Sequence, residues 1–318
     1  MKHIVEKLIK LKQEHPDSFF RALLTIFTKK TELLKASFQF TIYKKNLNSE
    51  QKDRIKNWKW YLYFYRKYSK FLKKLSFIDF PIDTQIPKII YWCWLQGEVN
   101  APELCKACLN SLRNNMPDYK IIIVTKENIW NLVSIPEIIR KKYEKGFITN
   151  THFSDIIRTY LLAEKGGIWI DSTVLCTGSF PKEILSNNFF VFQNFNRGDE
   201  AIFSSSWFIA SCKNHPILLY MEELLLTYWA EYNYLSHYYL FHLFFTIVCN
   251  CFPDFINNIP RYSNIPPHIL QYELFDKFDS ERYEEIKLMS SFHKLTWKNE
   301  KNIDISDTFF EHILNEYL

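Results

Sequence analysis

The amino-acid sequence predicts an α/β domain whose mainly parallel sheet is flanked by helices, with an α-helical extension in front of it. Stretches of helical periodicity alternate with three short apolar runs: KIIYWCW (88–94), YKIIIVT (119–125) and IWID (168–171). Because these runs lack polar alternation, they are typical of strands buried on both faces, as in a parallel sheet. Ligands of such sheets bind beyond the carboxyl ends of the strands, so we expect the chemistry there.

Helix start and stop signals lie between these runs. Residues 101–118 are expected to form a helix of roughly four turns, because Pro102 stands near its start and Pro117 just past its end. A second helix, over 151–165, is ended by the two glycines that open GGIWIDSTV (166–174). The third strand then follows at once and leads into a carboxylate.

The first 80 residues predict helices outside the sheet. Apolar positions recur at spacings of three and four in IVEKLIKL (4–11) and FFRALLTIF (19–27), and residues 57–75 are both basic and aromatic. Residues 79–87, DFPIDTQIP, carry two prolines and no periodicity, which indicates a linker. We therefore expect a basic helical extension over 1–80 and the α/β domain over 81–318.

The positive charge of the chain is concentrated in this extension. Residues 1–80 hold 19 Lys and Arg against 7 Asp and Glu, although the whole chain has a formal net charge of only +5. Two interpretations stay open: the solvated face of several helices, or a surface for an anionic membrane or an acidic partner. Nucleic acid is not expected as a partner, because no recognised binding motif accompanies the charge.

Cysteine usage indicates a reduced, cytoplasmic protein. The chain has seven cysteines, an odd number, and its start lacks the uninterrupted apolar core of a signal peptide. Cys105 and Cys108 in CKAC have a metal-type spacing, but the other close pair, Cys249 and Cys251, has a different one. We expect thiols that face a helical core rather than a zinc site.

One apolar segment, YLSHYYLFHLFFTIVCNCF (234–252), is long enough to span a bilayer and carries no formal charge. Polar residues interrupt it, however, and neither flank has the cluster of Lys and Arg that fixes the orientation of a membrane helix. We interpret it as a buried core helix.

Asp171 stands at the carboxyl end of the third strand, where an unpartnered carboxylate is costly to bury. Alone it could close a turn with the backbone of Thr173, and alone Asp155 and Arg158 could be a surface ion pair of the preceding helix. All three fall within 17 residues, together with the double glycine. Their combination favours a binding site over either local interpretation.

This block, SDIIRTYLLAEKGGIWID (154–171), resembles the sugar-nucleotide-binding region of glycosyltransferase family 32 and of capsular polysaccharide synthesis proteins, with a more distant similarity to glucosylating bacterial toxins. The similarity extends to IPKIIYWCWLQG (86–97) and HKLTWK (293–298) and covers residues 85–300. It implies a GT-A type, Rossmann-like fold. It also implies a bacterial hexosyltransferase that moves a sugar from a nucleoside diphosphate, expected to be UDP, to a hydroxyl of a growing glycan with retention of configuration.

The resemblance assigns roles to four residues. Trp94 matches the aromatic residue that stacks on the donor's base, and Asp155 and Arg158 match the pair that hydrogen-bonds the donor sugar. Asp171 matches the first carboxylate of the Asp-x-Asp motif, which contacts the ribose or sugar and helps to hold the metal. An indole can cover a base, and a carboxylate beside a guanidinium offers acceptors and donors to sugar hydroxyls. Asp155, Arg158 and Asp171 are therefore the expected catalytic residues.

The chain departs from the motif at Thr173, where the family has its second Asp, the direct metal ligand. Binding of Mn²⁺ or Mg²⁺ is therefore left open, although the diphosphate still needs positive charge near it. In HKLTWK this charge is expected from His293, as a metal ligand or phosphate donor, and from Lys294 or Lys298 as a point charge.

The rest of HKLTWK has two possible interpretations. By resemblance to the closing loop of the toxins, Thr296 and Trp297 are expected to close over the diphosphate. Alternatively, the alternation of Lys and Leu indicates an exposed strand.

The acceptor side is marked less clearly, and its expected partner is an oligosaccharide or lipid-linked glycan. An aromatic residue suits the apolar face of a sugar, and hydroxyls or imidazoles suit its polar groups. The candidates are Ser204, Ser205, Trp207, His237 and His242. A core role is equally open for each.

Because such glycans are built on lipid carriers, the basic segment 57–75 is expected to hold the enzyme peripherally on the inner face of the cell membrane.

Two other classes of function compete with an enzyme of this kind. A non-catalytic scaffold that binds glycans or nucleotide sugars stays open because of Thr173. A hydrolase with Asp171 as nucleophile is disfavoured, because a second carboxylate two residues on is missing. P-loop and dinucleotide-binding folds are excluded by the absence of their glycine patterns.

Overall fold

The computed structural model describes residues 47–75, 84–194, 200–296 and 304–318. The chain divides into two units between Tyr68 and Ser69. The boundary expected near residue 80, the two helical segments expected before residue 30 and most of the expected linker lie outside the described residues.

Helix α3 (Ser49–Leu72) confirms the helical prediction for the basic and aromatic segment. Its start is a reciprocal cap. The Oδ1 atom of Asn48 accepts from the amide of Gln51 at 2.8 Å, while Oε1 of Gln51 accepts from the amide of Asn48 at 3.0 Å. Two otherwise unpaired amides of the first turn are thereby satisfied, which fixes where the helix begins.

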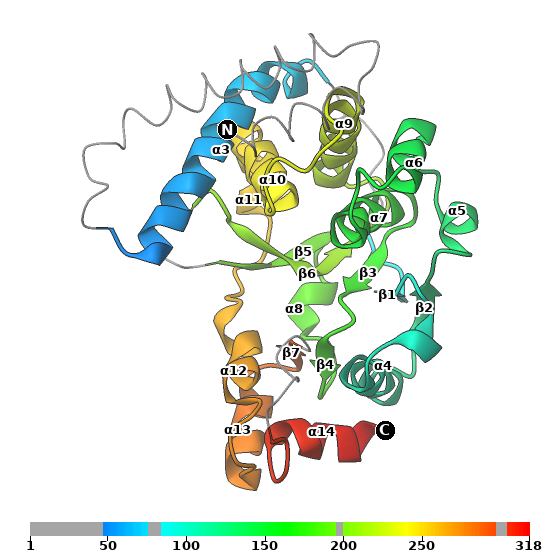
Figure 1. Cartoon of the computed structure of the whole chain (residues 1–318), viewed down its shortest axis with the longest axis vertical. Coiled ribbons are helices and arrows are strands. Elements are labelled where there is room, and N and C mark those ends of the chain that lie inside the picture. Colours follow the sequence, from blue (N-terminus) through cyan, green and yellow to red (C-terminus); the bar gives the residue numbers. More distant parts are fainter. Residues whose placement is uncertain (1–46, 76–83, 195–199, 297–303) are drawn as a thin grey trace, which may run out of the picture. The chain divides into compact units, whose positions relative to one another are not determined.

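The main sheet of the described chain has five strands in the order β2-β1-β3-β6-β5 (Figure 1). They are β1 (Ile89–Cys93), β2 (Lys120–Val124), β3 (Gly167–Ile170), β5 (Phe189–Gln193) and β6 (Ser204–Ser211). β1 pairs in parallel with both β2 and β3, whereas β6 runs antiparallel to β3 and β5. Four strands thus share a direction, so the predicted α/β class with a mainly parallel sheet is confirmed.

Helices cover both faces of this sheet (Figure 1). Helix α4 (Glu103–Asn115) packs Cys105, Leu109 and Leu112 into one core cluster with the even-numbered residues Ile90 and Trp92 of β1. Helices α7 (Asn150–Lys165) and α10 (Leu240–Cys251) lie against the other face, and α9 (Pro216–Glu231) packs against both of them. The shorter helices are α5 (Ile129–Leu132), α6 (Glu137–Glu144), α8 (Lys182–Leu185) and α11 (Pro253–Asn257), with a 3₁₀ turn at Glu98–Asn100.

A second sheet of two antiparallel strands, β4 (Val174–Cys176) and β7 (Phe292–Lys294), follows the end of β3. Around it pack the C-terminal helices α12 (Ile265–Glu273), α13 (Ser280–Met289) and α14 (Phe309–Tyr317). In this ladder Val174 stands opposite Lys294 and Leu175 opposite His293. The small sheet therefore brings a distant part of the sequence beside the end of the third strand.

The double glycine connects α7 to β3 without an intervening loop. Gly166 and Gly167 have φ angles of +66° and +113°, which residues with a side chain rarely adopt. A Cβ atom on Gly167 would also lie 2.9 Å from the carbonyl oxygen of Ile89, and one on Gly166 only 2.8 Å from the amide of Lys213. Backbones approach here more closely than any side chain permits, which explains why both residues are glycine.

Two predictions about buried segments are confirmed. Cys105 and Cys108 are fully buried in α4, and all seven cysteines are free thiols. Most of the apolar segment 234–252 is α10, a twelve-residue helix whose side chains are nearly all buried. Within the described ranges, no helix has both the length and the apolar character needed to cross a membrane.

Candidate active site

Arg158 joins the two predicted carboxylates. Its guanidinium donates from Nη1 to Oδ1 of Asp155 at 2.7 Å and from Nη2 to Oδ1 of Asp171 at 2.9 Å. The arginine side chain is only 4% exposed, whereas those of Asp155 and Asp171 are 13% and 26% exposed. The three residues predicted from their spacing therefore form one cluster at the carboxyl end of β3, with the carboxylates on its accessible side.

Backbone and side-chain contacts fix Asp171 in this position. Its amide donates to the carbonyl of Trp207 on β6 at 2.9 Å, and its Oδ1 accepts a second hydrogen bond, from Nε1 of Trp169, at 2.9 Å. The amide of Val174 donates to the carbonyl of Asp171 and closes the turn through the backbone. The Asp171 side chain is thus committed to Arg158 and Trp169, and the turn does not depend on it.

Asp155 is held from its other side by His152. Nδ1 of His152 lies 3.3 Å from Oδ2 of Asp155, and Nε2 of His152 accepts from Nε1 of Trp229 at 3.2 Å. Because Trp229 can only donate, this assigns the proton of a neutral His152 to Nδ1, which donates to the carboxylate. Burial alone raises the pKa of Asp155, but Arg158 and His152 outweigh it and lower the pKa below its usual value. Asp155 is therefore ionised at neutral pH.

Two aromatic rings support the guanidinium of Arg158. Its Cζ lies 5.0 Å from the ring centre of Trp169 and 5.6 Å from that of Phe241. These contacts suit a planar cation whose partners are partly desolvated. Its buried Nε has no hydrogen-bond partner among the described residues. The arginine is thus fixed by two rings and two carboxylates.

Lys294 approaches the same cluster from the small sheet. Its Nζ donates to Oγ1 of Thr173 and lies 3.7 Å from Oδ2 of Asp171. The lysine side chain is 22% exposed, and Thr173 is buried. The structure therefore places the predicted point charge beside the two motif positions, Asp171 and Thr173.

Comparison with known proteins identifies the family of the chain. The family model described as capsular polysaccharide synthesis protein matches residues 39–313, most of the chain. The chain belongs to this family. The resemblance to capsular polysaccharide synthesis proteins is thereby confirmed, while the finer resemblance to glycosyltransferase family 32 stays a prediction. No curated protein matches this family member.

Several solved structures are similar to this capsular polysaccharide synthesis family member at low identity. The PaToxG glycosyltransferase is 15% identical over 74% of this chain and 94% of its own, with a TM-score of 0.36. The galactosyltransferase LgtC, in complex with donor and acceptor sugar analogues, is 11% identical over 72% and 96%, with a TM-score of 0.38. A cysteine-to-serine mutant of a transferase is 11% identical over 58% and 96%, with a TM-score of 0.34.

His293 does not join the cluster in this family member. It neighbours Lys294 on β7 and points to the opposite side of the strand, where it is fully buried and its Nε2 lies 3.0 Å from Oγ1 of Thr177. Burial, and to a smaller extent Lys287, lowers the pKa of His293 to about 4. It is therefore a neutral core residue, out of reach of Asp171 as a shared metal ligand.

The other predicted donor residues are described in part. Trp94 follows β1 directly, is partly buried, and its amide donates to the carbonyl of Val124 at 3.1 Å. It thus lies at the same edge of the sheet as Asp171. Thr296 is partly buried, two residues beyond Lys294. Trp297 and Lys298 lie outside the described residues.

Three of the predicted acceptor residues open strand β6, whose start lies at the edge that carries Asp171. Ser204 and Trp207 are buried, and the ring of Trp207 stacks on that of Phe192 with 4.7 Å between centres. Ser205 accepts from Nδ2 of Asn264 at 3.0 Å. Of the three, Trp207 thus has a core role in this arrangement.

The two predicted histidines lie near or within α10. Nδ1 of the buried His237 accepts from the amide of Tyr239 at 3.2 Å, which gives His237 a local structural contact. His242 has a buried Nδ1 without a hydrogen-bond partner among the described residues. Burial lowers the pKa of His242 to about 4; Arg158 acts in the same direction, whereas Asp155 and Asp171 oppose it. His242 therefore lies close to the cluster as a neutral imidazole.

Several residues of the site were not predicted from the sequence. His152 stands one helical turn before Asp155 and Trp169 stands on the same strand face as Asp171, so helix and strand periodicity could have indicated both. Trp229 could not be found this way, because it lies on another helix. A further polar group, also missed, lies at the start of β6: Asn194, Asn264 and His268, which hydrogen-bond one another or Ser205.

The residues at this site do not fit a directly coordinated Mn²⁺ or Mg²⁺ ion. Oδ1 of Asp171 already accepts from Arg158 and Trp169, and its Oδ2 faces the ammonium of Lys294. Thr173 accepts from the same ammonium. A divalent ion needs several oxygen ligands, and a cation stands where it would approach. Among described residues, no group of three or more His, Cys, Asp or Glu could hold a metal ion.

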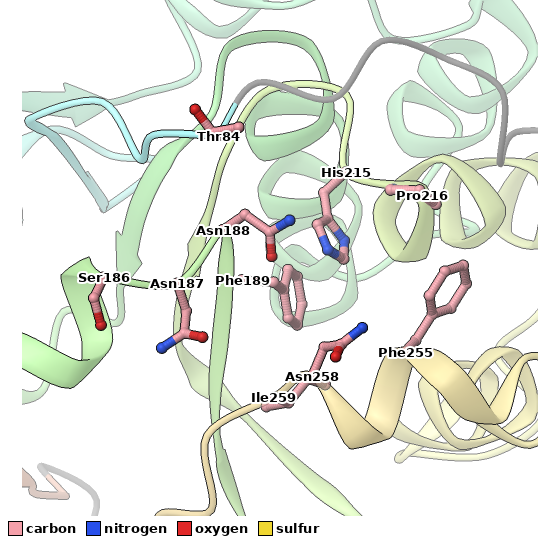
Figure 2. A pocket seen from close by; sticks show the side chains of 10 residues that line it. All are labelled: Thr84, Ser186, Asn187, Asn188, Phe189, His215, Pro216, Phe255, Asn258 and Ile259. Carbon is pink, nitrogen blue, oxygen red and sulfur yellow. The ribbon is translucent and has the colours of Figure 1, made fainter.

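A separate pocket of about 420 Å³ lies at the other end of β5 and β6 (Figure 2). Phe189 and His215 line it, with 4.5 Å between their stacked rings, together with Asn188 and Phe255. Phe189 pairs with Ser211, which also pairs with Gly167 at the start of β3, so the pocket lies at the opposite end of the sheet from Asp171. It is not part of the candidate active site.

Proposed function

We propose that this chain is a GT-A type glycosyltransferase. It moves a sugar from a nucleoside diphosphate donor, UDP-linked, to a hydroxyl of a glycan acceptor in capsular or other surface polysaccharide synthesis. The observation that carries this proposal is the bridge from Arg158 to Asp155 and Asp171 at the carboxyl edge of the sheet. Membership of the capsular polysaccharide synthesis family supports it.

The chemistry of the cluster suits a sugar with adjacent hydroxyls. An ionised carboxylate accepts hydrogen bonds, a guanidinium donates them, and the two are held in fixed relation. Asp155 and Arg158 bind the donor sugar, and Asp171 binds the ribose or the sugar through its partly exposed carboxylate. Trp94, at the same edge, covers the base.

The transfer proceeds with retention of configuration. The acceptor hydroxyl attacks the face of the sugar from which the diphosphate leaves, and an oxygen of the departing phosphate takes the hydroxyl proton. No separate protein base is required. Positive charge beside the diphosphate stabilises it as it leaves.

Hydrolysis of donor sugars tests this function without the acceptor. UDP-, GDP- and CMP-linked sugars are incubated with the full chain and with Asp155→Asn and Asp171→Asn, which keep the shape of the side chain. Turnover of a UDP-sugar that falls by about a hundredfold or more in both variants supports the proposal. Asp118→Asn is the matched control, because Asp118 is exposed and has no role in the site. Equal turnover in all four proteins would refute it.

The alternative function is a non-catalytic scaffold that binds nucleotide sugars or glycans. Thr173, in place of the second carboxylate of the motif, favours it. Binding of UDP-sugar without hydrolysis, and without transfer to any glycan of the producing strain's capsule, would favour the scaffold over the enzyme.

We also propose that α3 attaches the protein peripherally to an anionic membrane, at the inner face of the cell membrane. All five basic residues between positions 66 and 74 are exposed. The negative surface of such a membrane attracts a cluster of exposed Lys and Arg. Sedimentation with phosphatidylglycerol vesicles is expected to fall when these five residues are reversed to Glu. Unchanged sedimentation would contradict the attachment.

A further inference from the structure

We propose that the ammonium of Lys294 takes the place of a divalent metal ion in this active site. It binds the diphosphate of the donor and stabilises the diphosphate as the leaving group. The inference rests on the proposed glycosyltransferase function. It deepens that function, because it names the residue that replaces the cofactor.

The position of Lys294 is fixed by the small sheet. Its backbone pairs with Val174, and the amide of the next residue, Leu295, donates to the carbonyl of Thr173 at 2.8 Å. The side chain therefore has to extend over the turn that carries Asp171 and Thr173. Its Nζ contacts both residues of the motif, one through a hydrogen bond and the other at 3.7 Å.

The charges balance as they do in a metal site. A divalent ion bound by the second carboxylate of an Asp-x-Asp motif adds two positive charges and one negative charge, a net single positive charge. Here Thr173 is neutral and Lys294 adds one positive charge. Beside Asp171, a diphosphate thus meets the same net charge in both arrangements, which is what leaving-group stabilisation requires.

Lys294 also keeps hydrogen-bonding capacity for a ligand. An ammonium has three N–H donors, and one of them is used by Thr173. The distance of 3.7 Å to Asp171 exceeds the usual length of a charge-assisted hydrogen bond, so that carboxylate does not saturate the ammonium. The guanidinium of Arg158 is shared between Asp155 and Asp171, so Lys294 brings the four charged groups to a net charge of zero. The side chain is partly exposed, so phosphate oxygens can reach it.

Binding of UDP and of inorganic pyrophosphate, measured by calorimetry with EDTA and with Mn²⁺, tests the inference. The wild type is expected to bind both probes equally in EDTA and in Mn²⁺. Lys294→Met is expected to weaken both by about tenfold or more, and Lys294→Arg by less, because a charge-assisted hydrogen bond is lost only in the first. Lys277→Met is the control, because Lys277 is 83% exposed and pairs with Asp307 on the surface.

A double variant that is designed to restore metal binding tests the inference without measuring turnover. Thr173→Asp combined with Lys294→Asn restores the second carboxylate and removes the ammonium. This double variant is expected to gain a bound Mn²⁺ ion, detected by electron paramagnetic resonance, and to bind UDP only when Mn²⁺ is present. The wild type is expected to show no bound Mn²⁺ in the same spectrum.

The outcomes separate the two proposals. Wild-type UDP binding that disappears in EDTA, or that is unchanged in a folded Lys294→Met variant, would overturn the role of Lys294 and leave the glycosyltransferase function standing. A wild type that binds neither UDP nor pyrophosphate under any condition would overturn the function and the role of Lys294 together. Circular dichroism of each variant confirms that it is folded.

Discussion

The guanidinium of Arg158 lies 2.9 Å from the carboxylate of Asp171, which links the middle of α7 to the end of β3. The same guanidinium holds Asp155 one helical turn away. Because Arg158 is nearly fully buried, its two ion pairs are poorly screened by solvent, in contrast to the surface pairs of the protein. This cluster is therefore both part of the proposed site and part of the folded core.

Arg158→Lys is expected to abolish the proposed donor hydrolysis and to lower the free energy of unfolding. A lysine has one ammonium and cannot reach both carboxylates with the geometry of a planar fork. Breaking a buried pair costs about 3 to 5 kcal/mol, which urea unfolding would measure. The surface pair of Arg140 with Glu144 supplies the control, and Arg140→Lys is expected to cost less than about 1 kcal/mol. If both substitutions lowered the free energy of unfolding equally, the buried ion pairs of Arg158 would have no special importance for stability.

Gly167→Ala is expected to destabilise the fold by about 2 kcal/mol or more, because the new Cβ meets the backbone of β1 and the φ angle is unfavourable for alanine. Gly146→Ala is the matched control. Its φ of +75° is also positive, but nothing lies within 4 Å of the added atom. Thermal unfolding of both variants separates the clash from the backbone strain that they share. If Gly146→Ala lowers the midpoint as much as Gly167→Ala, the close approach has no energetic importance.

The stability of the protein is expected to fall as the pH drops below about 6.5, the ordinary pKa of histidine. Burial lowers the pKa of His215 to about 3 and those of His242 and His293 to about 4, so all three are neutral in the fold while the unfolded chain takes up their protons. Each histidine contributes a slope of up to about 1.4 kcal/mol per pH unit between its lowered pKa and its ordinary one. Burial raises the pKa of Glu222 to about 8, so this one carboxyl group opposes the three histidines between about pH 8 and its ordinary pKa. Asp155 does not contribute in this range, because its lowered pKa matters only in stronger acid.

Urea unfolding at pH 7.5, 6.5 and 5.5 measures this slope. His293→Gln keeps a polar partner for Thr177 but cannot titrate, so its slope is expected to be smaller than that of the wild type. A free energy of unfolding that does not fall between pH 6.5 and pH 5.5 would show that the three histidines are protonated in the fold.

The buried thiols are expected to resist modification while the protein is folded. Cys105, Cys108, Cys176 and Cys249 are fully buried, and burial raises the pKa of Cys176 to about 12. Thiolate is the reactive form, so a raised pKa slows attack on a disulfide reagent. Titration with such a reagent at pH 8 should leave these four thiols unmodified, and all seven should react in guanidinium chloride. Rapid reaction of any of the four in the folded protein would contradict their burial.

Much of the fold follows from local sequence patterns. Each of the three apolar runs is a strand of the sheet. Helix α7 ends at Lys165, directly before the glycine pair, as the sequence predicted. Asp155, Arg158 and Asp171 were predicted for the same reason: all three lie on one helix and the strand that directly follows it. A cluster contained in one helix-strand unit can be predicted from spacing, whereas the roles of its residues were expected from the family resemblance.

Residues that meet through long-range pairing were harder to predict. Lys294 lies 121 positions from Thr173 and reaches it only because β4 and β7 form a ladder. Strand alternation shows that His293 and Lys294 face opposite sides, but only the register shows which one faces the site. The antiparallel direction of β6 depends in the same way on its neighbours, since its apolar run resembles those of the parallel strands.

The direct junction of α7 and β3 at Gly166 and Gly167 has a consequence for sugar selectivity. With no loop between the helix and the strand, the hydrogen-bonding groups of Asp155, Arg158 and Asp171 are preorganised before the donor arrives. A rigid array of charges matches one stereochemical pattern of hydroxyls. An epimer with one hydroxyl inverted would leave a desolvated charge without a partner, which discriminates far more strongly than a difference in size. In the proposed enzyme, the two glycines therefore support the discrimination between epimeric sugars.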